Sequence, residues 1–549
     1  MRKSGFLEGT LIATTAIIIT KILGILYVIP FYAIVGVQGS ALYAYAYNIY
    51  LIFLDISSAG IPAAMSKIIK EYNTLGNMDA KVRAYKIGKR IISVLSIIAF
   101  LIMFCFASSF AKLILGDLTG GNTIEDVTMV IRAISFAILV IPFLSVSKGY
   151  LQGHNVISVS SISQVIEQFF RIAIIILGSY VALRLLNLPI GVSVSIAVSG
   201  AFIGGIISIM YIKLKMNKNK KELSLNETMD KTSITDKEIL KKIVHYATSF
   251  IIVSIAVSIY GFVDMVFVSR TMGAIGFSAD KTEFITAAVT TWAPKIGMVI
   301  NSIAMGLAVS LIPNMVEANT LKQWDKVQDH LNKGMQIVLS VCIPMSIGIA
   351  MLSKSIWVVF YGTEELALGS LILSIYIFQP LFFNLYLVTS TTMQSLNRFK
   401  IVYLSTILGY ATNALLDVPL MYLCKYIGLE PFVGAIIASV IGYSLSISIA
   451  LIHLYKKHKI KYNETVKIFA KTLIPSAIML VIVFALKLII PVNYDSKLSC
   501  IFYIAIISVI GGICYLYVAF KQGLLYSVFC KEYLNKIIRK ITFNKISIQ

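Results

Sequence analysis

Four oxygen-bearing side chains in the second half of the chain have the types and spacing of a cation site. Asp264 lies in the apolar stretch GFVDMVFVS, and Ser439 lies in GAIIASV. Asn413 and Asp417 are four residues apart in ATNALLDVP, so they share one face of a helix. Carboxylate, amide and hydroxyl oxygens suit a small hard cation, and buried carboxylates could equally carry a proton. The structural alternative is that Asn413 bonds a neighbouring helix while Asp417 lies at a loop before Pro419.

Charged residues also interrupt the apolar stretches of the first half. An ionisable side chain at membrane depth costs roughly 2.5–3.5 kcal/mol, so it usually faces a cavity or a partner. Lys21 lies about 16 Å from either end of its apolar stretch, too deep to reach the membrane surface easily, so we expect it to face a polar cavity. Asp55 lies nearer one end of the next stretch, so its position fits the cavity and the membrane surface equally well. Glu167 and Arg171 are four residues apart and form either a structural ion pair or part of the cavity.

Two further features lie close to expected helix ends. Lys295 follows Pro294 in TTWAPKIG, where a proline can kink a helix and free carbonyls toward a cavity, so Lys295 joins the candidate cavity residues. Four tyrosines in YAYAYNIY fit a belt at the membrane surface better than a binding surface. They are Tyr43, Tyr45, Tyr47 and Tyr50.

Fourteen apolar segments are long enough to span a bilayer as helices, which requires about 20 residues each. The chain of 549 residues is 58% hydrophobic and only 13% charged, which is typical of an all-α polytopic membrane protein. The expected spans are 8–30, 41–66, 91–113, 127–147, 161–183, 191–213, 243–268, 286–312, 335–360, 368–392, 401–425, 432–455, 468–490 and 499–520.

The connectors between these spans alternate in charge. Segment 67–90 contains seven basic and two acidic residues, and segment 213–242 contains nine lysines and five acids. Segments 114–126 and 361–367 contain acidic residues and no basic ones. Because basic connectors stay in the cytoplasm, this pattern predicts a multi-pass membrane protein with both termini cytoplasmic.

The longest polar stretch follows the sixth span and divides the chain. The expected parts are an N-terminal six-helix lobe (1–213), a basic linker (214–242), a C-terminal six-helix lobe (243–455), two extra helices (456–520) and a basic tail (521–549). Gln152 and Asn155 follow span four at the same spacing as Gln394 and Asn397 follow span ten. This weak internal repeat predicts that the lobes are related by an axis along the membrane normal and enclose a central cavity.

Several function classes lack the residues that they require. The net charge of +22 is concentrated in membrane connectors, which argues against nucleic-acid binding. The chain has no G-x-x-x-x-G-K-[ST] phosphate loop and no catalytic histidine cluster, so we expect neither ATP hydrolysis nor an enzyme. The six cysteines have no CxxC spacing and fit small hydrophobic residues better than disulfides or metal ligands.

Three motifs carry a resemblance to a known family. They are T-K-x-L-G at Thr20–Gly24, A-G-I-P at Ala59–Pro62 followed by Ser66-Lys67, and K-G-Y-L-Q-G-x-N at Lys148–Asn155. With them the chain resembles MurJ-type lipid II flippases, and more narrowly the YtgP/SpoVB branch of polysaccharide biosynthesis proteins in the MOP exporter superfamily. The first 75 residues carry the specific part of the match, and the remainder matches in span pattern.

The resemblance implies a fold, a cargo and site residues. It implies two lobes around a cavity, a hydrophobic groove formed with spans thirteen and fourteen, and lipid II, an undecaprenyl-pyrophosphate-linked precursor, as cargo. Lys21 matches a cavity arginine of the family, and the cavity set is Lys21, Asp55, Glu167, Arg171 and Lys295. Asp264, Asn413, Asp417 and Ser439 match a sodium site, with Ala435 at the position of a backbone carbonyl ligand.

The chain also departs from the family pattern. Tyr27 and Val28 stand where many relatives carry a basic and an acidic residue. The arginine expected shortly before Pro294 is missing, and Thr290 and Thr291 lie nearby.

The expected function is a monomeric flippase that moves lipid II from the inner to the outer leaflet by alternating access, driven by an ion gradient, with Na⁺ a candidate ion, or by the membrane potential. The alternatives are an exporter of another undecaprenyl-linked unit, a drug or cation antiporter of the same fold, a membrane-embedded transferase, and a scaffold without transport activity.

Overall fold

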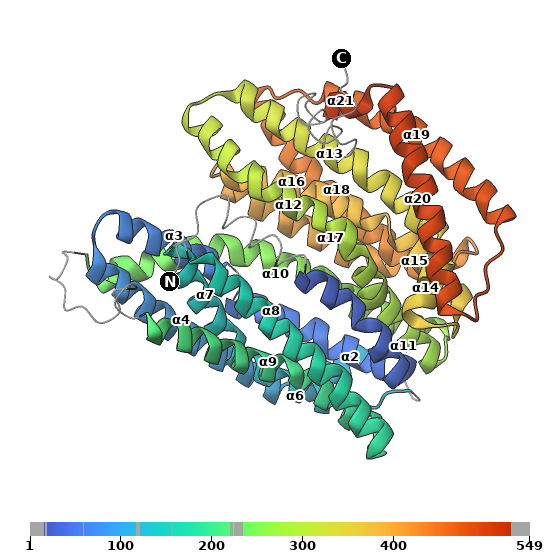
Figure 1. The fold of residues 1–549 in the computed structure, drawn as a ribbon, viewed down its shortest axis with the longest axis horizontal. Helices are drawn as coiled ribbons and strands as arrows, with labels where there is room; N and C mark the ends of the chain where they lie inside the picture. Colours follow the sequence, from blue (N-terminus) through green and yellow to red (C-terminus); the bar gives the residue numbers. More distant parts are fainter. Residues whose placement is uncertain are drawn as a thin grey trace. The chain divides into compact units, whose positions relative to one another are not determined.

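The computed structural model is all-helical over the residues that it describes, which are 16, 19–58, 60–116, 121–154, 156–219, 223 and 234–528 (Figure 1). The chain forms two compact units, Met1–Thr291 and Trp292–Gln549. Exposed apolar residues along the helices and backbone hydrogen bonds satisfied inside each helix are what a bilayer requires. The stretch 1–15, most of the linker and the tail after residue 528 lie outside the described residues.

The described part of the first unit contains a helical segment at 19–26, ten further helices and three short irregular turns. The helices are α2 (Val28–Ser58), α3 (Ile61–Thr74), α4 (Met78–Cys105), α5 (Ala107–Leu115), α6 (Ile124–Ser135), α7 (Ile141–Gly153), α8 (Ile157–Ala173), α9 (Ile190–Lys218), α10 (Asp236–Ile275) and α11 (Ala279–Ala287). The turns are the 3₁₀ turn η1 (Phe136–Leu139) and the π turns η2 (Ile174–Gly178) and η3 (Val181–Leu185).

The second unit begins as the π turn η4 (Ala288–Trp292) gives way to α12. Its helices are α12 (Ala293–Thr320), α13 (Trp324–Met351), α14 (Ser353–Tyr361), α15 (Leu366–Tyr376), α16 (Gln379–Ser395), α17 (Phe399–Tyr426), α18 (Phe432–His458), α19 (Asn463–Ile489), α20 (Lys497–Lys521) and α21 (Leu524–Val528).

Glycine sets the two breaks in the early helices. Gly36 has φ +66° and ψ −166° inside α2, so the helical stretch bends there. Gly60 has φ +72° just before α3, which begins with Pro62 in its first turn. A left-handed φ costs other residues about 1–2 kcal/mol, and proline fits a first helical turn, which explains why these residue types stand at the breaks. The expected span 41–66 is therefore interrupted at Gly60.

Eleven helical stretches among the described residues are long and apolar enough to cross a membrane. One of them, Ile19–Ser58, contains the bend at Gly36 and covers most of the two expected spans at 8–30 and 41–66. The expected spans 243–268 and 286–312 fall in α10 and in the stretch from the end of α11 through α12, where the side chains of some residues are not described. The polytopic, all-helical prediction is confirmed, and the count of fourteen spans stays a prediction.

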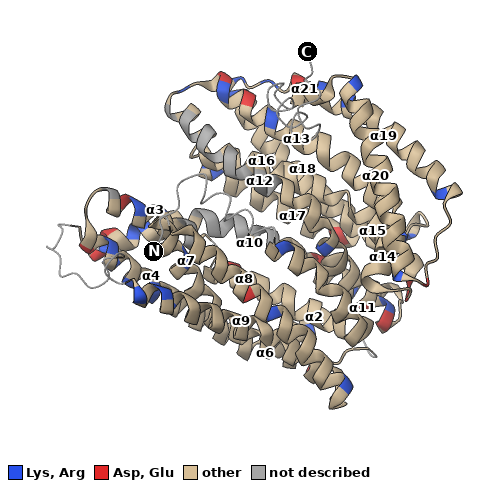
Figure 2. Ribbon diagram, viewed as in Figure 1, with Lys and Arg blue, Asp and Glu red and all other residues tan. Residues whose placement is uncertain are grey.

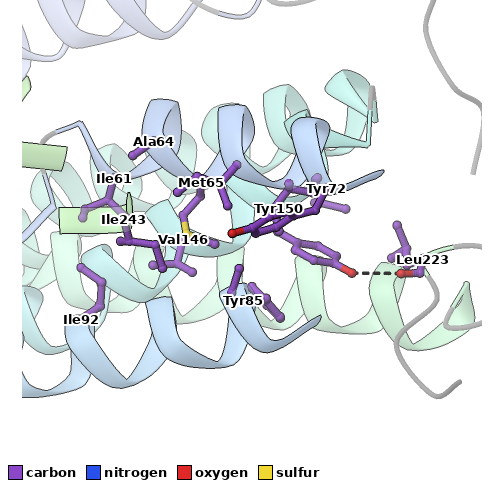
Figure 3. Packing of buried hydrophobic residues seen from close by; sticks show 14 of the residues in the cluster. Ile61, Ala64, Met65, Tyr72, Tyr85, Ile92, Val146, Tyr150, Leu223 and Ile243 are labelled. Atoms are coloured by element: carbon purple, nitrogen blue, oxygen red, sulfur yellow. Dashed lines mark hydrogen bonds between the residues drawn. The ribbon is translucent and has the colours of Figure 1, made fainter. Parts of the chain in front are cut away.

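A buried apolar cluster at one end of the first unit holds α3, α4, α7 and the start of α10 together (Figure 3). Met65, Tyr85 and Tyr150 lie inside it, and the rings of Tyr85 and Tyr150 are 4.3 Å apart. The Tyr150 hydroxyl donates a hydrogen bond of 2.9 Å to the carbonyl of Leu223, so a linker residue is anchored to this core.

Charged residues lie mainly near helix ends and connectors, whereas most helix middles are uncharged (Figure 2). At the end that holds the apolar cluster, Arg83 pairs with Asp79 at 2.9 Å and with Asp236 at 2.7 Å. These pairs fix the beginning of α10 against α4. The helix α9 continues to Lys218 and α10 begins at Asp236, so both helices extend into the expected linker 214–242.

Candidate functional site

Glu167 joins two basic side chains inside the first unit. On α8 the Arg171 guanidinium donates to the Glu167 carboxylate at 2.8 Å, which confirms the predicted ion pair. Lys148 of α7 donates to the same carboxylate at 3.3 Å. All three side chains are at most 16% exposed. The group therefore carries a net positive charge within a membrane-spanning region.

Tyrosines surround the Arg171 end of this group. Tyr43, Tyr47 and Tyr50 are near enough to act electrostatically on the guanidinium. Tyr43 and Tyr47 stack with ring centroids 5.5 Å apart, and the Tyr27 hydroxyl donates to Tyr43 at 3.3 Å.

The expected surface belt of tyrosines is wrong for most of these side chains. Tyr43, Tyr45 and Tyr50 are at most 6% exposed, and Tyr47 is half-buried. The physical reason is that Tyr43, Tyr47 and Tyr50 turn toward the interior of the unit and the Arg171 charge, while Tyr45 is buried on another face of α2. A bilayer surface would instead require exposed rings.

Lys21 lies on a helical segment that packs against α8. It is half-buried and has interactions of its own in the unit. A Cβ on Gly24, one turn later, would lie 3.4 Å from the Gln168 amide nitrogen. Gln168 is next to Glu167, so Lys21 and the Glu167–Arg171 pair occupy adjoining helices of one unit.

Asp55 and Asn48 on α2 connect this helix to α10 and η4. The Ser258 hydroxyl donates to the Asp55 carboxylate. The Asn48 amide donates to the Thr291 hydroxyl at 3.0 Å. Asp55 is half-buried, and its hydrogen-bond partner is a neutral hydroxyl.

Lys295 lies in the second unit, in the first turn of α12. It is half-buried and has interactions within the structure. The π turn η4 lies just before Pro294, as the expected helix distortion requires, and the carbonyl of Trp292 accepts a hydrogen bond from the Tyr361 hydroxyl at 2.9 Å. This hydrogen bond joins η4 to the aromatic cluster of Trp292, Trp357 and Tyr361 in the second unit.

Three of the expected sodium ligands come together in the second unit. The Asn413 amide nitrogen lies 3.1 Å from an Asp417 carboxylate oxygen and 3.1 Å from the Ser439 hydroxyl. All three residues and Ala435 are at most 1% exposed. Asp264 is buried on α10 in the first unit.

The structural alternative to an ion site had two parts, one for Asn413 and one for Asp417, and the structure confirms only the first. Asn413 does bond the neighbouring helix α18 through Ser439. The alternative that Asp417 lies at a loop is wrong, because α17 continues past Pro419 to Tyr426. A proline can remain within a helix when neighbouring groups compensate for its missing hydrogen bond.

The donor chemistry of the Asn413 cluster fits a small hard cation. No group of three or more His, Cys, Asp or Glu side chains in the described part of the chain could hold a metal ion. The cluster instead supplies one carboxylate, one amide and one hydroxyl. As oriented, the amide presents its nitrogen to Asp417 and Ser439, so an ion between them requires the amide to turn its oxygen inward.

An apolar pocket of about 540 Å³ lies within the second unit. Helices α12, α13, α19 and α20 contribute most of its walls, among them Val299, Pro344, Ile349, Met479, Val483 and Ile507. Gly348 and Gly512 also line it, and a Cβ built on either would meet no atom within 4 Å. The missing side chains keep the pocket open.

Sequence reasoning missed several residues of these groups. Lys148 lies in the motif K-G-Y-L-Q-G-x-N, and that position was the one available signal for its role. Ser258 and Asn48 gave no signal, because polar residues in apolar helices are common and their partners are distant in sequence. The pocket was expected from family resemblance alone.

Comparisons with known proteins place the chain in a family. The polysaccharide biosynthesis protein family matches residues 6–319, more than half of the chain. This chain belongs to that family. A second family, MatE, matches residues 250–418.

Curated relatives of this polysaccharide biosynthesis protein come from Bacillus subtilis (strain 168). The protein named "Lipid II flippase MurJ" is 31% identical over 533 residues, which cover 96% of this chain and 97% of the relative. The protein named "Stage V sporulation protein B" is 23% identical and covers 62% of this chain and 63% of the relative. The predicted MurJ-type resemblance is thereby confirmed.

Solved structures show that the polysaccharide biosynthesis protein has the fold of MOP-superfamily transporters. A structure titled "Lipid II flippase MurJ, inward closed conformation" matches with a TM-score of 0.64 at 17% identity, covering 93% of this chain and 99% of that one. An inward-facing multidrug resistance MATE family transporter matches with a TM-score of 0.59 at 16% identity, covering 79% of this chain and 93% of that one. Both relatives are transporters, and the chain is a multi-pass bacterial membrane protein.

Proposed function

We propose that the protein is a flippase that moves lipid II from the inner to the outer leaflet of the plasma membrane. The observation that carries this proposal is the 31% identity to the Bacillus subtilis protein named lipid II flippase MurJ, which extends over nearly the full length of both chains. The buried cationic group of the first unit and the apolar pocket of the second unit support it.

The cationic group suits the head of such a cargo. A pyrophosphate linked to sugars and a peptide carries negative charge that hydrocarbon does not solvate. Lys21, Lys148 and Arg171 supply positive charge at membrane depth, and Arg171 has a planar fork that matches phosphate oxygens. Tyrosine hydroxyls beside Arg171 add neutral donors. In the proposed cycle the head binds here, and Glu167 keeps the basic groups in position before it arrives.

The apolar pocket suits the polyprenyl tail. Each methylene that leaves water contributes about 0.8 kcal/mol, although a tail already in lipid gains less and is held chiefly by shape. The pocket between α13, α19 and α20 offers an apolar lining that glycines keep open. The tail thus remains in an apolar environment while the head crosses.

Transport proceeds by alternating access of two six-helix lobes around a central cavity that contains Lys21, Asp55, Glu167, Arg171 and Lys295. The driving force is the membrane potential, at about 2.3 kcal/mol per charge per 100 mV, or a gradient of Na⁺. The proposed ion site consists of Asp264, Asn413, Asp417, Ser439 and the carbonyl of Ala435. The basic connectors support cytoplasmic termini, and we propose that the protein acts as a monomer.

Depletion of the protein tests this function in cells. In a strain without a redundant flippase, lipid II should accumulate on the cytoplasmic face, and plasmid-borne protein should restore export. Lys21→Ala should fail to restore growth although it is expressed at the level of the unaltered protein. Normal export after depletion contradicts the function, whereas normal growth with Lys21→Ala removes only Lys21 from it.

A drug or cation antiporter is the second candidate, because the MatE family matches residues 250–418. A cavity for cationic drugs needs uncompensated acidic residues in the first unit. There Glu167 is paired with two bases, so Asp55, which accepts from the Ser258 hydroxyl, is outnumbered by the basic residues Lys21, Lys148 and Arg171. Resistance to cationic dyes on overexpression, without any effect of depletion on lipid II, would favour the antiporter.

A further inference from the structure

A group of basic side chains lies at one end of the second unit, apart from the residues discussed above. It consists of Arg398 before α17 and of His453, Lys457 and His458 near the end of α18. The charges of Arg398 and Lys457 act on both imidazoles. None of the charges that act on the two rings belongs to a carboxylate among the described residues. We name these four residues the basic corner.

The basic corner contains polar nitrogen atoms that have no partner among the described residues. The Nε2 atoms of His453 and His458 and the Nε atom of Arg398 are shielded from solvent, and no hydrogen-bond partner for them is found among the described residues. Buried nitrogen atoms of this kind are nearly always partnered in folded proteins. Three such atoms in one corner, with only like charges around them, indicate a missing acceptor that carries negative charge.

Neighbouring contacts hold the corner in shape. The ring of Trp324, the first residue of α13, stacks on His458 with centroids 3.6 Å apart and an angle of 19°. Next to it, the Gln328 side chain accepts from the Lys461 backbone at 2.7 Å, and the Asn332 amide donates to the Lys461 carbonyl at 2.9 Å. The turn after α18 is therefore fixed to α13. A fixed arrangement of donors costs less to organise around a ligand.

Apolar surface adjoins the corner. On the same helix, Ile452 is 52% and Tyr455 is 55% exposed. In a membrane protein such side chains face lipid, and a tryptophan such as Trp324, stacked on His458 at the end of this helix, is typical of the interface between headgroups and acyl chains. An anion in this corner would therefore sit at headgroup level with hydrocarbon beside it.

We propose that the basic corner binds the phosphate of a membrane lipid headgroup. Arg398 and the two imidazoles donate to the phosphate oxygens, and Lys457 contributes a mobile charge at the exposed side. The acyl chains lie along Ile452 and Tyr455. The proposed orientation of the chain places this lipid in the cytoplasmic leaflet, and the binding itself does not depend on transport.

Native mass spectrometry of the full-length protein tests the site. The purified chain is titrated with phosphatidylglycerol, with phosphatidylcholine, and with inorganic phosphate as a competitor. The unaltered protein should retain phosphatidylglycerol in preference to phosphatidylcholine, and millimolar phosphate should not remove it. The variant R398Q/H458Q should bind phosphatidylglycerol about tenfold more weakly, as loss of charge-assisted hydrogen bonds implies.

Lys456→Gln is the matched control. Lys456 is exposed on the same helical turn and does not act on either imidazole, so its removal lowers the charge equally but should leave the lipid preference intact. R398Q alone keeps the stack of Trp324 on His458 and should still weaken binding of phosphatidylglycerol. This single variant tests the site even if the double variant unfolds.

Three results would overturn the proposal. One is an unchanged lipid preference in folded R398Q. Another is an equal loss of preference in Lys456→Gln. The third is displacement of the lipid by inorganic phosphate, which would assign a free-anion site. A separate translocation assay on the same variants distinguishes failure of this site from failure of the flippase function.

Discussion

Glu167 holds two basic residues together inside the first unit, and its removal is the sharpest single-residue change. Glu167→Gln would leave Arg171 and Lys148 close together without their counter-charge. Removing one partner of a buried ion pair typically costs about 3–5 kcal/mol. We therefore expect a clearly lower thermal unfolding midpoint, measured by intrinsic fluorescence in detergent.

Glu125→Gln is the control, since Glu125 is an exposed carboxylate in the first turn of α6. It should change the midpoint little. Equal midpoints for Glu167→Gln and Glu125→Gln would show that the ion pair contributes nothing to stability.

Glu283 gives the protein a pH-dependent contribution to stability. Burial raises the pKa of its carboxyl from 4.5 to about 7, although Asn122 donates to it from the backbone at 2.6 Å and from the side chain at 2.7 Å. Because the pKa is raised, the folded protein holds this proton more tightly than the unfolded chain. The contribution is fully present below about pH 4.5 and is lost as the pH rises to about 7.

The variant Glu283→Gln should therefore lack this contribution to the pH profile. Unfolding midpoints of the unaltered protein, compared with those of the variant, should fall between pH 4.5 and pH 7 as the pH rises. Parallel profiles for the two proteins would show that Glu283 does not titrate in this range.

For individual side chains, the sequence predicts the contacts that depend on spacing along one helix. The Glu167–Arg171 pair followed from a separation of four residues, and its geometry is confirmed. Lys148 completes the group from another helix, which no local pattern encodes. The tyrosines of α2 were assigned to the wrong surface, because an apolar helix with tyrosines on several faces does not reveal which face turns inward.

Among the helices, α2 depends most clearly on a single residue, because it bends at Gly36. Its φ of +66° is strained for any residue with a side chain, so Gly36→Ala should cost about 1–2 kcal/mol. No atom lies within 4 Å of the added Cβ, so the cost would come from the backbone alone. Gly348→Ala, in a regular helix with similar free space, should have little effect on the unfolding midpoint. The reverse order of the two midpoints would contradict the bend as a source of strain.

Filling the pocket between α13, α19 and α20 tests its proposed role with the lipid tail. Gly512→Leu should reach into the space that the missing side chain leaves open and weaken retention of a polyprenyl phosphate several-fold in native mass spectra. Ala485→Leu adds three of the same four carbon atoms to the exposed face of α19 and should leave retention unchanged. If both variants retain the lipid like the unaltered protein, the tail does not occupy the pocket.

Helix boundaries show where element prediction stops. Hydropathy located the apolar stretches, but not the bend at Gly36, the break before α3 or the π turns, because these depend on single residues within uniformly apolar sequence. The sequence also indicated an end that does not exist, because Pro419, which was expected near a loop, lies inside α17.

On the scale of the whole chain, composition alone predicted the all-helical membrane class, because a bilayer permits few other folds. Resemblance then supplied the family, which the full-length match to the Bacillus subtilis MurJ protein confirms. The compact units divide at Thr291, whereas the linker after the sixth span suggested a division near residue 213. Packing of α10 and α11 against α2 decides that division, and such long-range packing is absent from local sequence.

We propose that this protein moves a pyrophosphate-linked lipid across the bilayer. The most direct measurement is translocation of fluorescent lipid II in vesicles that contain the purified chain, under imposed voltage and sodium gradients, with another undecaprenyl-linked lipid for comparison. We predict protein-dependent transfer of lipid II between leaflets that a gradient accelerates and that Lys21→Ala abolishes. Transfer no faster than in protein-free vesicles, under every gradient and with correctly folded protein, would contradict the account.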